Sequence, residues 1–274
     1  MPPLPLDNGV DSCTAKGHTP LIEATIANRL DLMFEHTLNV VILNKSDALG
    51  NTPLHYAVES GFMQGVVLLA NQGCQLELFN LDHLTPLMLA LKEHHIAVAE
   101  FLIKEGASPY LLNSKYESAL NMAIEMHQFD LMRVMLKQED IPEIRLPSLY
   151  VACVTAAKCD GIEYIPPLID AGANLNFTLH DVDPPLNISA GRGNPEMVRV
   201  WLKHGASVES YDLEGFTPLM SASIIGCIDV CRILIDHGAR IDAVSADGQY
   251  TAHSLALKWQ QFHCAAYLAS LRVS

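Results

Sequence analysis

A three-residue pattern, Thr-Pro-Leu, recurs along this chain at a nearly constant spacing. Exact or degenerate copies begin at Thr19, Thr52, Thr85, Ser118, Pro147, Pro184, Thr217 and Thr251. Most steps are 33 residues, and a 29-residue step after Ser118 is balanced by a 37-residue step to Pro184. A period of about 20 to 50 residues indicates a chain built by stacking copies of one small unit. This recurrence excludes most globular folds before any other feature is considered.

The most regular copy, Asn51 to Leu78, shows what each unit should form. Apolar residues recur at helical spacing over residues 52–60 and again over 63–71. Thr52 can cap the first helix, and Pro53 occupies the first helical position, where proline's missing N–H costs nothing. Gly73 follows the second helix, where a positive φ is wanted. Two helices this short cannot bury both apolar faces alone, so we expect neighbouring copies to stack.

These motifs resemble the ankyrin repeat family over about residues 12–272, in about eight units. The TPL-x-x-A motif is present, and second helices end in Gly-Ala at 106–107, 172–173, 205–206 and 238–239. The resemblance implies an all-α solenoid of stacked helix-turn-helix units with β-hairpin loops, whose hairpin tips and first helices line a concave face. We expect a flexible, Pro-containing leader (1–13) and a single repeat domain (14–274). The repeats should start near 14, 47, 80, 113, 142, 179, 212 and 246.

The repeat pattern breaks down between residues 137 and 167. Pro142 and Pro147 predict that no continuous helix runs through this junction, because proline removes a backbone donor and clashes with the preceding turn. Pro166 and Pro167 stand where a second helix should run, so we expect a short helix beginning near them. The junction is therefore the predicted place for an altered stacking angle or a hinge.

Composition narrows the classes of partner. The chain has 31 acidic and 17 basic residues, a net charge of −14, which argues against nucleic acid and favours a basic partner. Seven cysteines without regular spacing indicate reduced thiols. The sequence shows no signal-peptide pattern and no apolar run of about 18 residues. We expect a cytoplasmic, possibly nuclear protein with no membrane association.

Motifs that carry chemistry are scarce. No glycine-rich phosphate loop, HExxH, CxxC or GxSxG pattern occurs, which predicts a protein that is not an enzyme and needs no cofactor. Cys227 and Cys231 could recruit His263 or Cys264 as zinc ligands. Small thiols filling core positions are the favoured alternative, so no metal is predicted. The resemblance gives His55 a structural role, as a hydrogen-bond partner of hairpin backbone.

In the ankyrin register, the positions that face a partner are the hairpin tips and the last residues of the first helices. The middle of the chain supplies mostly acids there: Glu59, Asp82, Glu93, Glu117 and Glu125, with Met126 beside them. The C-terminal part supplies Arg192, Phe216, Ile224, Ile225, Tyr250 and Trp259. Large apolar residues beside an arginine are typical of binding hot spots. An ordinary solvated face is the alternative for the acids, and packing into a terminal cap is the alternative for Trp259.

The sequence therefore predicts a non-catalytic protein–protein interaction module: an adaptor, scaffold or inhibitor, monomeric by itself. Its concave face would bind a basic and hydrophobic segment or domain. The alternatives are a pathogen effector or a regulatory or substrate-recruiting subunit of an enzyme complex, acting in ubiquitin ligation or transcription-factor inhibition.

Overall fold

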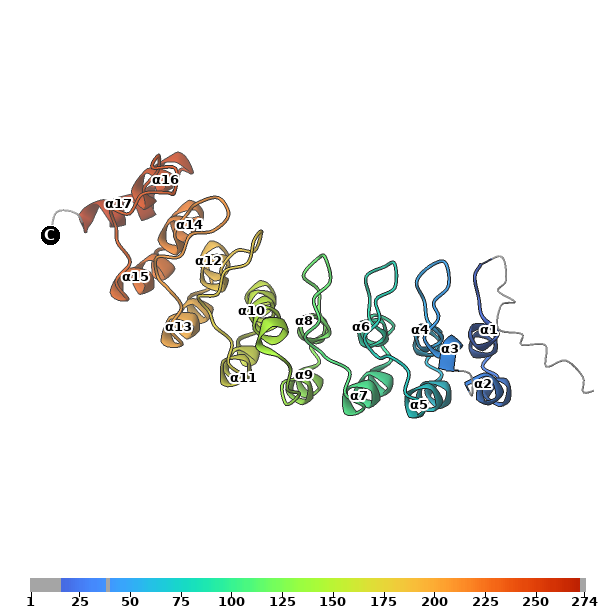
Figure 1. Ribbon diagram of the computed structural model, residues 1–274. Coiled ribbons are helices and arrows are strands. Elements are labelled where there is room, and N and C mark those ends of the chain that lie inside the picture. Colours follow the sequence, from blue (N-terminus) through green and yellow to red (C-terminus); the bar gives the residue numbers. More distant parts are fainter. Residues whose placement is uncertain (1–15, 38–39, 272–274) are drawn as a thin grey trace, which may run out of the picture. The chain divides into compact units, whose positions relative to one another are not determined.

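The computed structural model describes residues 16–37 and 40–271, so the predicted leader 1–13 and the predicted first-repeat start near residue 14 lie outside the described residues. The described residues form a helical repeat structure in which helices follow one another in antiparallel pairs (Figure 1). The chain divides into two compact units, residues 1–122 and 123–274. The expected all-α repeat solenoid is confirmed. The assignment of residues 14–274 to a single domain stays a prediction.

In the first unit the helices are α1 (Pro20–Ile26), α2 (Leu30–Thr37), the short α3 (Val40–Leu43), α4 (Pro53–Glu59), α5 (Met63–Asn71), α6 (Pro86–Lys92) and α7 (Ile96–Lys104). Helix α8 (Ala119–Glu125) spans the boundary between the units. Helices α1, α4 and α6 pack side by side as one layer, while α2 and α5 pack in a second layer (Figure 1).

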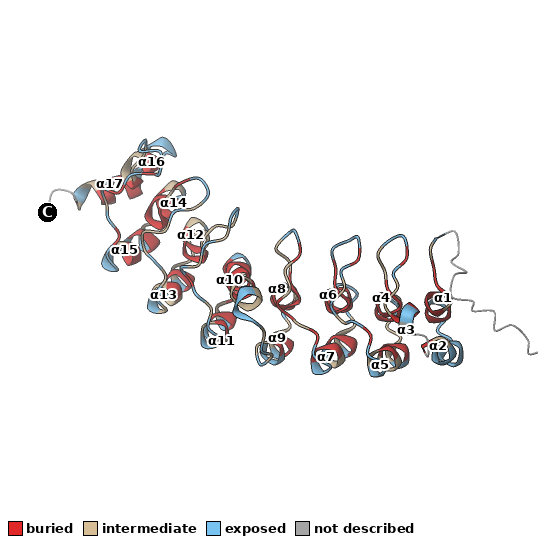
Figure 2. Cartoon of the chain, viewed as in Figure 1, coloured by how far each residue is buried: buried red, intermediate tan, exposed pale blue. Residues whose placement is uncertain are grey.

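In the second unit the helices are α9 (Phe129–Met135), α10 (Pro142–Lys158), a 3-10 turn (Ile162–Tyr164), α11 (Ile165–Asp170), α12 (Pro185–Gly191), α13 (Pro195–Lys203), α14 (Pro218–Ile225), α15 (Ile228–Asp236), α16 (Ala252–Lys258) and α17 (Phe262–Ser270). The first-helix layer runs α10, α12, α14, α16, and the second-helix layer includes α13, α15 and α17. Buried residues line the sides of the helices that face one another within each unit (Figure 2).

Threonine caps start most of the first helices, as the sequence predicts. The Thr52, Thr85 and Thr217 hydroxyls each accept a hydrogen bond from the amide three residues on, and a proline follows each threonine. The cap satisfies one of the orphan amides at the helix start. Helix ends are thereby held at defined positions on the face that the hairpins border.

The hairpin turns are closed by an Asp or Asn side chain. Asp47 Oδ1 accepts hydrogen bonds from the amides of Leu49 and Asn51, both at 2.9 Å. Asn113 and Asp212 make the same two bonds with residues two and four positions on. These side-chain hydrogen bonds close each hairpin turn, so the turn does not depend on a long run of paired β-strand residues. A single isolated bridge, Val244 to Thr251, is found in the described residues.

In α4 and α12, a side chain three residues after the cap position ties the helix to the next hairpin. The Thr52 amide donates to His55 Nδ1 at 3.2 Å, which leaves the His55 Nε2–H to donate to the Leu84 carbonyl at 3.2 Å. The structural role expected of His55 is confirmed. Asn187 holds the corresponding position in the second unit, and its Nδ2 donates to the Phe216 carbonyl at 2.9 Å.

The prediction that Pro142 and Pro147 interrupt the helix is wrong. Helix α10 runs unbroken for 17 residues with Pro147 inside it. Pro142 takes the first helical position, and the carbonyl that Pro147 leaves without an amide partner belongs to Glu143, an exposed residue that water can reach. The ten residues 148–157 are all buried, so packing stabilises the helix despite the missing bond.

The expectation for the following helix is confirmed. Helix α11 spans only six residues and contains Pro166 and Pro167 in its first turn. The 3-10 turn before it covers Ile162–Tyr164, and Tyr164 is buried. The altered stacking angle or hinge at this junction stays a prediction.

Candidate partner-binding surfaces

The predicted acids of the first unit lie at hairpins and helix ends. Glu59 is the last residue of α4, Glu93 follows α6 directly, and Asp82 lies at the tip of the hairpin before α6; all three are exposed. Glu117 is half-buried and its carboxylate accepts a 2.7 Å hydrogen bond from Asn113 Nδ2, so it also holds its own hairpin.

Glu125 and Met126 belong to the second unit. Glu125 is the last residue of α8 and is exposed, while Met126 is half-buried. The five acids are thus divided between the two compact units. Their joint contribution to one acidic groove stays a prediction.

Arg192 is engaged within the chain. Its Nη2 donates to Asp160 Oδ2 at 2.7 Å, and Asn194 Nδ2 donates to the other Asp160 oxygen at 3.0 Å. The hydrogen bond from Arg192, followed by that from Asn194, lowers the pKa of the Asp160 carboxyl. Sequence reasoning missed Asp160, because its place opposite Arg192 depends on how consecutive repeats stack. A partner acid would have to compete for this guanidinium.

Two aromatic residues border the start of α14 and α16. Phe216 and Tyr250 pack edge to face with their ring centroids 6.4 Å apart. The Lys258 Nζ lies 4.2 Å from the Tyr250 ring centroid and donates a 3.0 Å hydrogen bond to the Tyr250 hydroxyl. Both rings are half-buried, so part of each remains open to a ligand. Lys258, absent from the predicted site, adds a cation to this cluster.

The other ends of the same two helices carry exposed apolar side chains. Ile225, the last residue of α14, is 41% exposed, and Trp259, directly after α16, is 55% exposed. Trp259 is therefore not packed into a terminal cap. Ile224 is half-buried. The Ile225 side chain packs over Gly193, where a Cβ atom would lie 2.9 Å from its Cδ1.

We call the set Phe216, Ile225, Tyr250, Lys258 and Trp259 the C-terminal apolar surface. Helices α14 and α16 pack against each other, and each is about 10 to 12 Å long at 1.5 Å per residue. The aromatic pair and the exposed pair border opposite ends of these helices. The arrangement suits an extended or helical segment lying along them.

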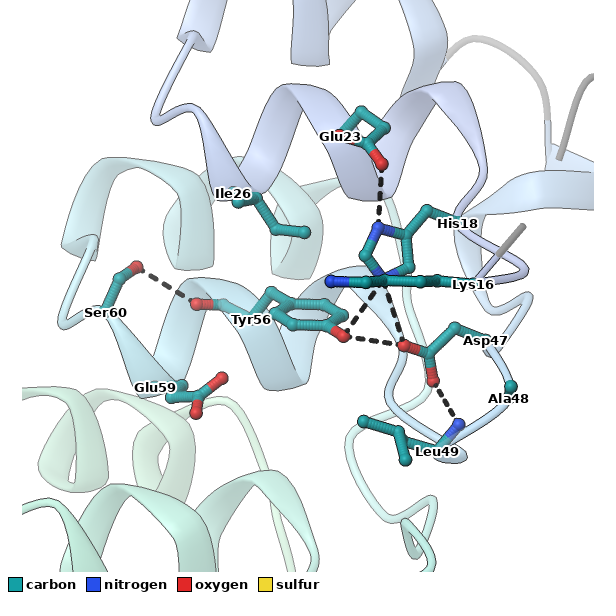
Figure 3. A pocket seen from close by; sticks show the side chains of 10 residues that line it. All are labelled: Lys16, His18, Glu23, Ile26, Asp47, Ala48, Leu49, Tyr56, Glu59 and Ser60. Atoms are coloured by element: carbon teal, nitrogen blue, oxygen red, sulfur yellow. Dashed lines mark hydrogen bonds and ion pairs between the residues drawn. The ribbon is translucent and has the colours of Figure 1, made fainter. Parts of the chain in front are cut away.

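A pocket of about 920 Å³ lies in the first unit, between α1, α4 and the hairpin at 47–51 (Figure 3). Its lining residues are Lys16, His18, Glu23, Ile26, Asp47, Ala48, Leu49, Tyr56, Glu59 and Ser60. Of these, sequence reasoning placed only Glu59 in the site. Ile26 occupies the same repeat position as Glu59, 33 residues earlier, which was the available signal.

The pocket wall is a hydrogen-bonded network. The Tyr56 hydroxyl donates to Asp47 Oδ2 at 2.6 Å, and His18 Nδ1 lies 2.7 Å from Glu23 Oε1 (Figure 3). Burial, and then the hydrogen bond to Asp47, raise the pKa of Tyr56 to about 12. The phenol therefore stays protonated at physiological pH and donates its hydrogen bond to the Asp47 carboxylate.

The cysteines considered as zinc ligands separate in the structure. Cys231 and Cys264 are buried with their Sγ atoms 3.7 Å apart, whereas Cys227 Sγ lies near the Gly193 carbonyl. The hydrogen bond from the Cys231 thiol lowers the pKa of the Cys264 thiol. Among residues 16–37 and 40–271, no three His, Cys, Asp or Glu side chains are grouped so as to hold a metal ion. No helix in those ranges combines the length and apolar character that crossing a membrane requires.

Comparison with protein families matches most of the chain to one repeat model. The model described as "Ankyrin repeats (3 copies)" matches residues 4–80 and 153–245, and the single ankyrin repeat model matches residues 82–114. The chain belongs to the ankyrin-repeat family. Its threonine caps, hairpin turns and paired helices are therefore the local structure of ankyrin repeats.

Curated relatives of this ankyrin-repeat chain come from distant organisms. The chain is 30% identical over 243 residues to the human B-cell lymphoma 3 protein, covering 72% of this chain and 53% of that protein. It is 24% identical over 199 residues to "Putative ankyrin repeat protein FPV014" of fowlpox virus, covering 72% and 38% respectively. The chain thus spans about half, or less, of the length of these relatives.

A solved structure shares the fold. The ankyrin repeat domain of Bcl-3, described as a unique member of the IkappaB protein family, matches 78% of this chain and 98% of its own length. The TM-score is 0.64 and the sequence identity 27%. Ankyrin repeats are protein–protein interaction modules, which agrees with the general function predicted from the sequence.

Proposed function

We propose that this ankyrin-repeat chain is a non-catalytic protein-binding module that seats a hydrophobic segment of its partner on the C-terminal apolar surface. The observation that carries the proposal is the exposure of Ile225 and Trp259 on neighbouring helix ends of one compact unit. Tryptophan is enriched among residues whose truncation costs the most binding energy. Burying these side chains against a partner would remove their apolar surface from water.

The surface is preorganised. Helices α14 and α16 both start with capping boxes, at Thr217 and Thr251, and Gly226 ends α14 in the left-handed conformation. The helix ends that present Ile225 and Trp259 are thus held before binding. A rigid surface loses little conformational entropy on association, so more of the contact energy appears as affinity.

The acids supply the second element of the proposal. Glu59, Asp82 and Glu93 are exposed and the chain has a net charge of −14, so a basic partner would be steered toward it. We propose that a basic region of the partner contacts these three acids of the first unit. This contribution should weaken as salt is added, because exposed charges are screened beyond about 10 Å at 0.1 M salt.

Two narrower roles have support from the relatives. The first role that we propose is a regulatory subunit that inhibits a transcription factor; Bcl-3, described as a unique member of the IkappaB protein family, is among the similar structures. The second role that we propose is an effector that acts on host machinery; an ankyrin repeat protein of fowlpox virus is among the relatives. The binding surface would be the same in both roles.

The test is affinity purification with mass spectrometry, followed by titration of the purified partner. Ile225→Asp and Trp259→Ala should each raise the Kd by about 30-fold or more, which corresponds to at least about 2 kcal/mol. Val134→Asp replaces a similarly exposed apolar residue on α9 and should leave the Kd within about threefold. Unchanged affinity in both surface variants would refute the site assignment.

A further inference from the structure

The pocket between α1 and α4 has the chemistry of a receptor for one kind of side chain. We propose that it receives an arginine of the partner protein, with the guanidinium between Glu59 and Glu23 and against the Tyr56 ring. The inference rests on the proposed protein-binding function and specifies the partner chemistry of a site distinct from the C-terminal apolar surface.

The floor of the pocket is fixed. Asp47, whose side chain is 1% exposed, accepts hydrogen bonds from the Leu49 and Asn51 amides on Oδ1 and from the Tyr56 hydroxyl on Oδ2. His18 Nε2 lies 3.5 Å from the same Oδ2. The bonds made by Asp47 hold the Tyr56 ring at the pocket wall, where it lies among the other lining side chains (Figure 3). An arginine would therefore meet an aromatic face that is already in place.

Two carboxylates at the pocket keep acceptor capacity. Glu59 is exposed, and within the described residues its carboxylate has no hydrogen bond or ion pair. Glu23 uses only Oε1, which contacts His18 Nδ1 at 2.7 Å. Among the lining residues that lie in the described ranges, Lys16 is the one lysine or arginine, against three carboxylates. The excess of negative charge selects a cation and repels phosphate or a second carboxylate.

Apolar side chains flank the charged groups. Ile26, at the end of α1, is 42% exposed, and Leu49, at the hairpin tip, is 59% exposed. They offer contact to the aliphatic stem of a long side chain, as arginine buries its methylenes along apolar surface while its head remains polar. The pocket volume of about 920 Å³ leaves space for flanking residues of a peptide.

The combination favours arginine over other insertions. A guanidinium is planar, so it can pair with a carboxylate through two parallel hydrogen bonds while it stacks flat on an aromatic ring. An ammonium can lie over a ring but cannot stack flat on it or form the two parallel hydrogen bonds. An aliphatic or aromatic side chain of the partner would strip water from Glu59 and Glu23 without replacing their hydrogen bonds, which is unfavourable.

The experiment begins with a random-peptide library displayed on phage and selected on the immobilised full chain. The strongest peptide is then synthesised with arginine, lysine or the uncharged near-isostere citrulline at its arginine position. We expect selected peptides to share one arginine, and both Arg→citrulline and Glu59→Gln to weaken binding by about tenfold. The affinity of the lysine peptide should lie between those of the arginine and citrulline peptides.

A double-mutant cycle locates the contact. The Kd of the Glu59→Gln variant for the citrulline peptide should be no more than about threefold higher than the Kd after either single change. Both changes remove the same guanidinium–carboxylate pair, so their effects should not add. Glu105→Gln, an exposed glutamate at the end of α7 outside the pocket, is the matched control and should leave binding unchanged. Urea midpoints of the variants verify that folding is intact.

Selected peptides without a shared arginine, or fully additive losses in the cycle, would overturn the inference. Either result leaves the proposed function separately testable, because the effect of Ile225→Asp and Trp259→Ala on the purified partner does not depend on this pocket.

Discussion

The regular region, residues 47–104, and the irregular region, residues 142–170, reach the same helix-pair architecture by different means. In the regular region, Thr52 and Thr85 cap their helices and Asp47 closes its hairpin. In the irregular region, Ile141 precedes α10 without any side-chain cap, and Pro147 removes a hydrogen bond. The irregular helix is instead buried through ten consecutive residues. Extensive burial can therefore replace the local signals of the repeat.

The largest expected effect tests whether the two regions are equally well packed. Leu149→Ala in α10 and Leu54→Ala in α4 remove fully buried leucines and should each lower the free energy of unfolding by about 2 to 5 kcal/mol. Urea unfolding followed by circular dichroism measures both. A loss below about 1 kcal/mol for Leu149→Ala alone would mean that the irregular region is loosely packed, and would break the comparison.

The next effect concerns the hairpin closure that the regular region relies on. Asp47→Ala should lower the free energy of unfolding by about 1 to 3 kcal/mol, because it leaves the Leu49 and Asn51 amides and the Tyr56 hydroxyl without their acceptor. Asp47→Asn keeps an acceptor in place, as Asn113 does in its own hairpin, and should lose less than half as much. Equal losses for the two variants in urea unfolding would show that charge, and not turn closure, is what matters.

A third effect is a pH dependence specific to the regular region. Burial lowers the pKa of His55 below its ordinary value of 6.5. The unfolded chain then binds this proton more readily than the folded chain. The contribution of neutral His55 to the free energy of unfolding is therefore fully present above about pH 6.5. It decreases as the pH falls below that value, by up to about 1.4 kcal/mol per pH unit, until the folded-state pKa is reached.

His55→Asn isolates that contribution. Asparagine already plays the corresponding part at Asn187, so the variant should keep the tie to the next hairpin and lose the pH dependence. The measurement is the difference in unfolding free energy between wild type and variant at pH 7.5 and at about pH 5.5. A difference that does not change with pH would contradict a buried neutral His55.

The smallest effect probes the proline inside α10. Pro147→Ala restores an amide that can donate to the Glu143 carbonyl and should raise the free energy of unfolding by about 1 kcal/mol. Pro142→Ala, at the first helical position, is the control and should change stability by less than about 0.5 kcal/mol, because no intrahelical bond is at stake there. Destabilisation by Pro147→Ala would show that the proline ring itself is needed in the packing.

The binding residues were less predictable than the fold. The repeat position placed Ile225 and Trp259 on helix ends, and the structure shows both exposed. The same position could not show that Arg192 is paired with Asp160, or that Glu117 is bonded to Asn113. Those contacts join side chains whose meeting depends on turn conformation and on the stacking of consecutive repeats, which residue spacing does not specify.

The sequence by itself determined the repeat period, the threonine caps and the short helix at Pro166 and Pro167, because each depends on interactions within a few residues or on the repeat register. The role of His55 followed from the resemblance to ankyrin repeats, since its bond to the Leu84 carbonyl joins two consecutive repeats. Only the tertiary structure decided that α10 continues through Pro147, since burial of the whole helix outweighs one missing hydrogen bond. It also decided that His18, Asp47 and Tyr56 assemble a pocket beside Glu59, because those residues meet only when two repeats stack.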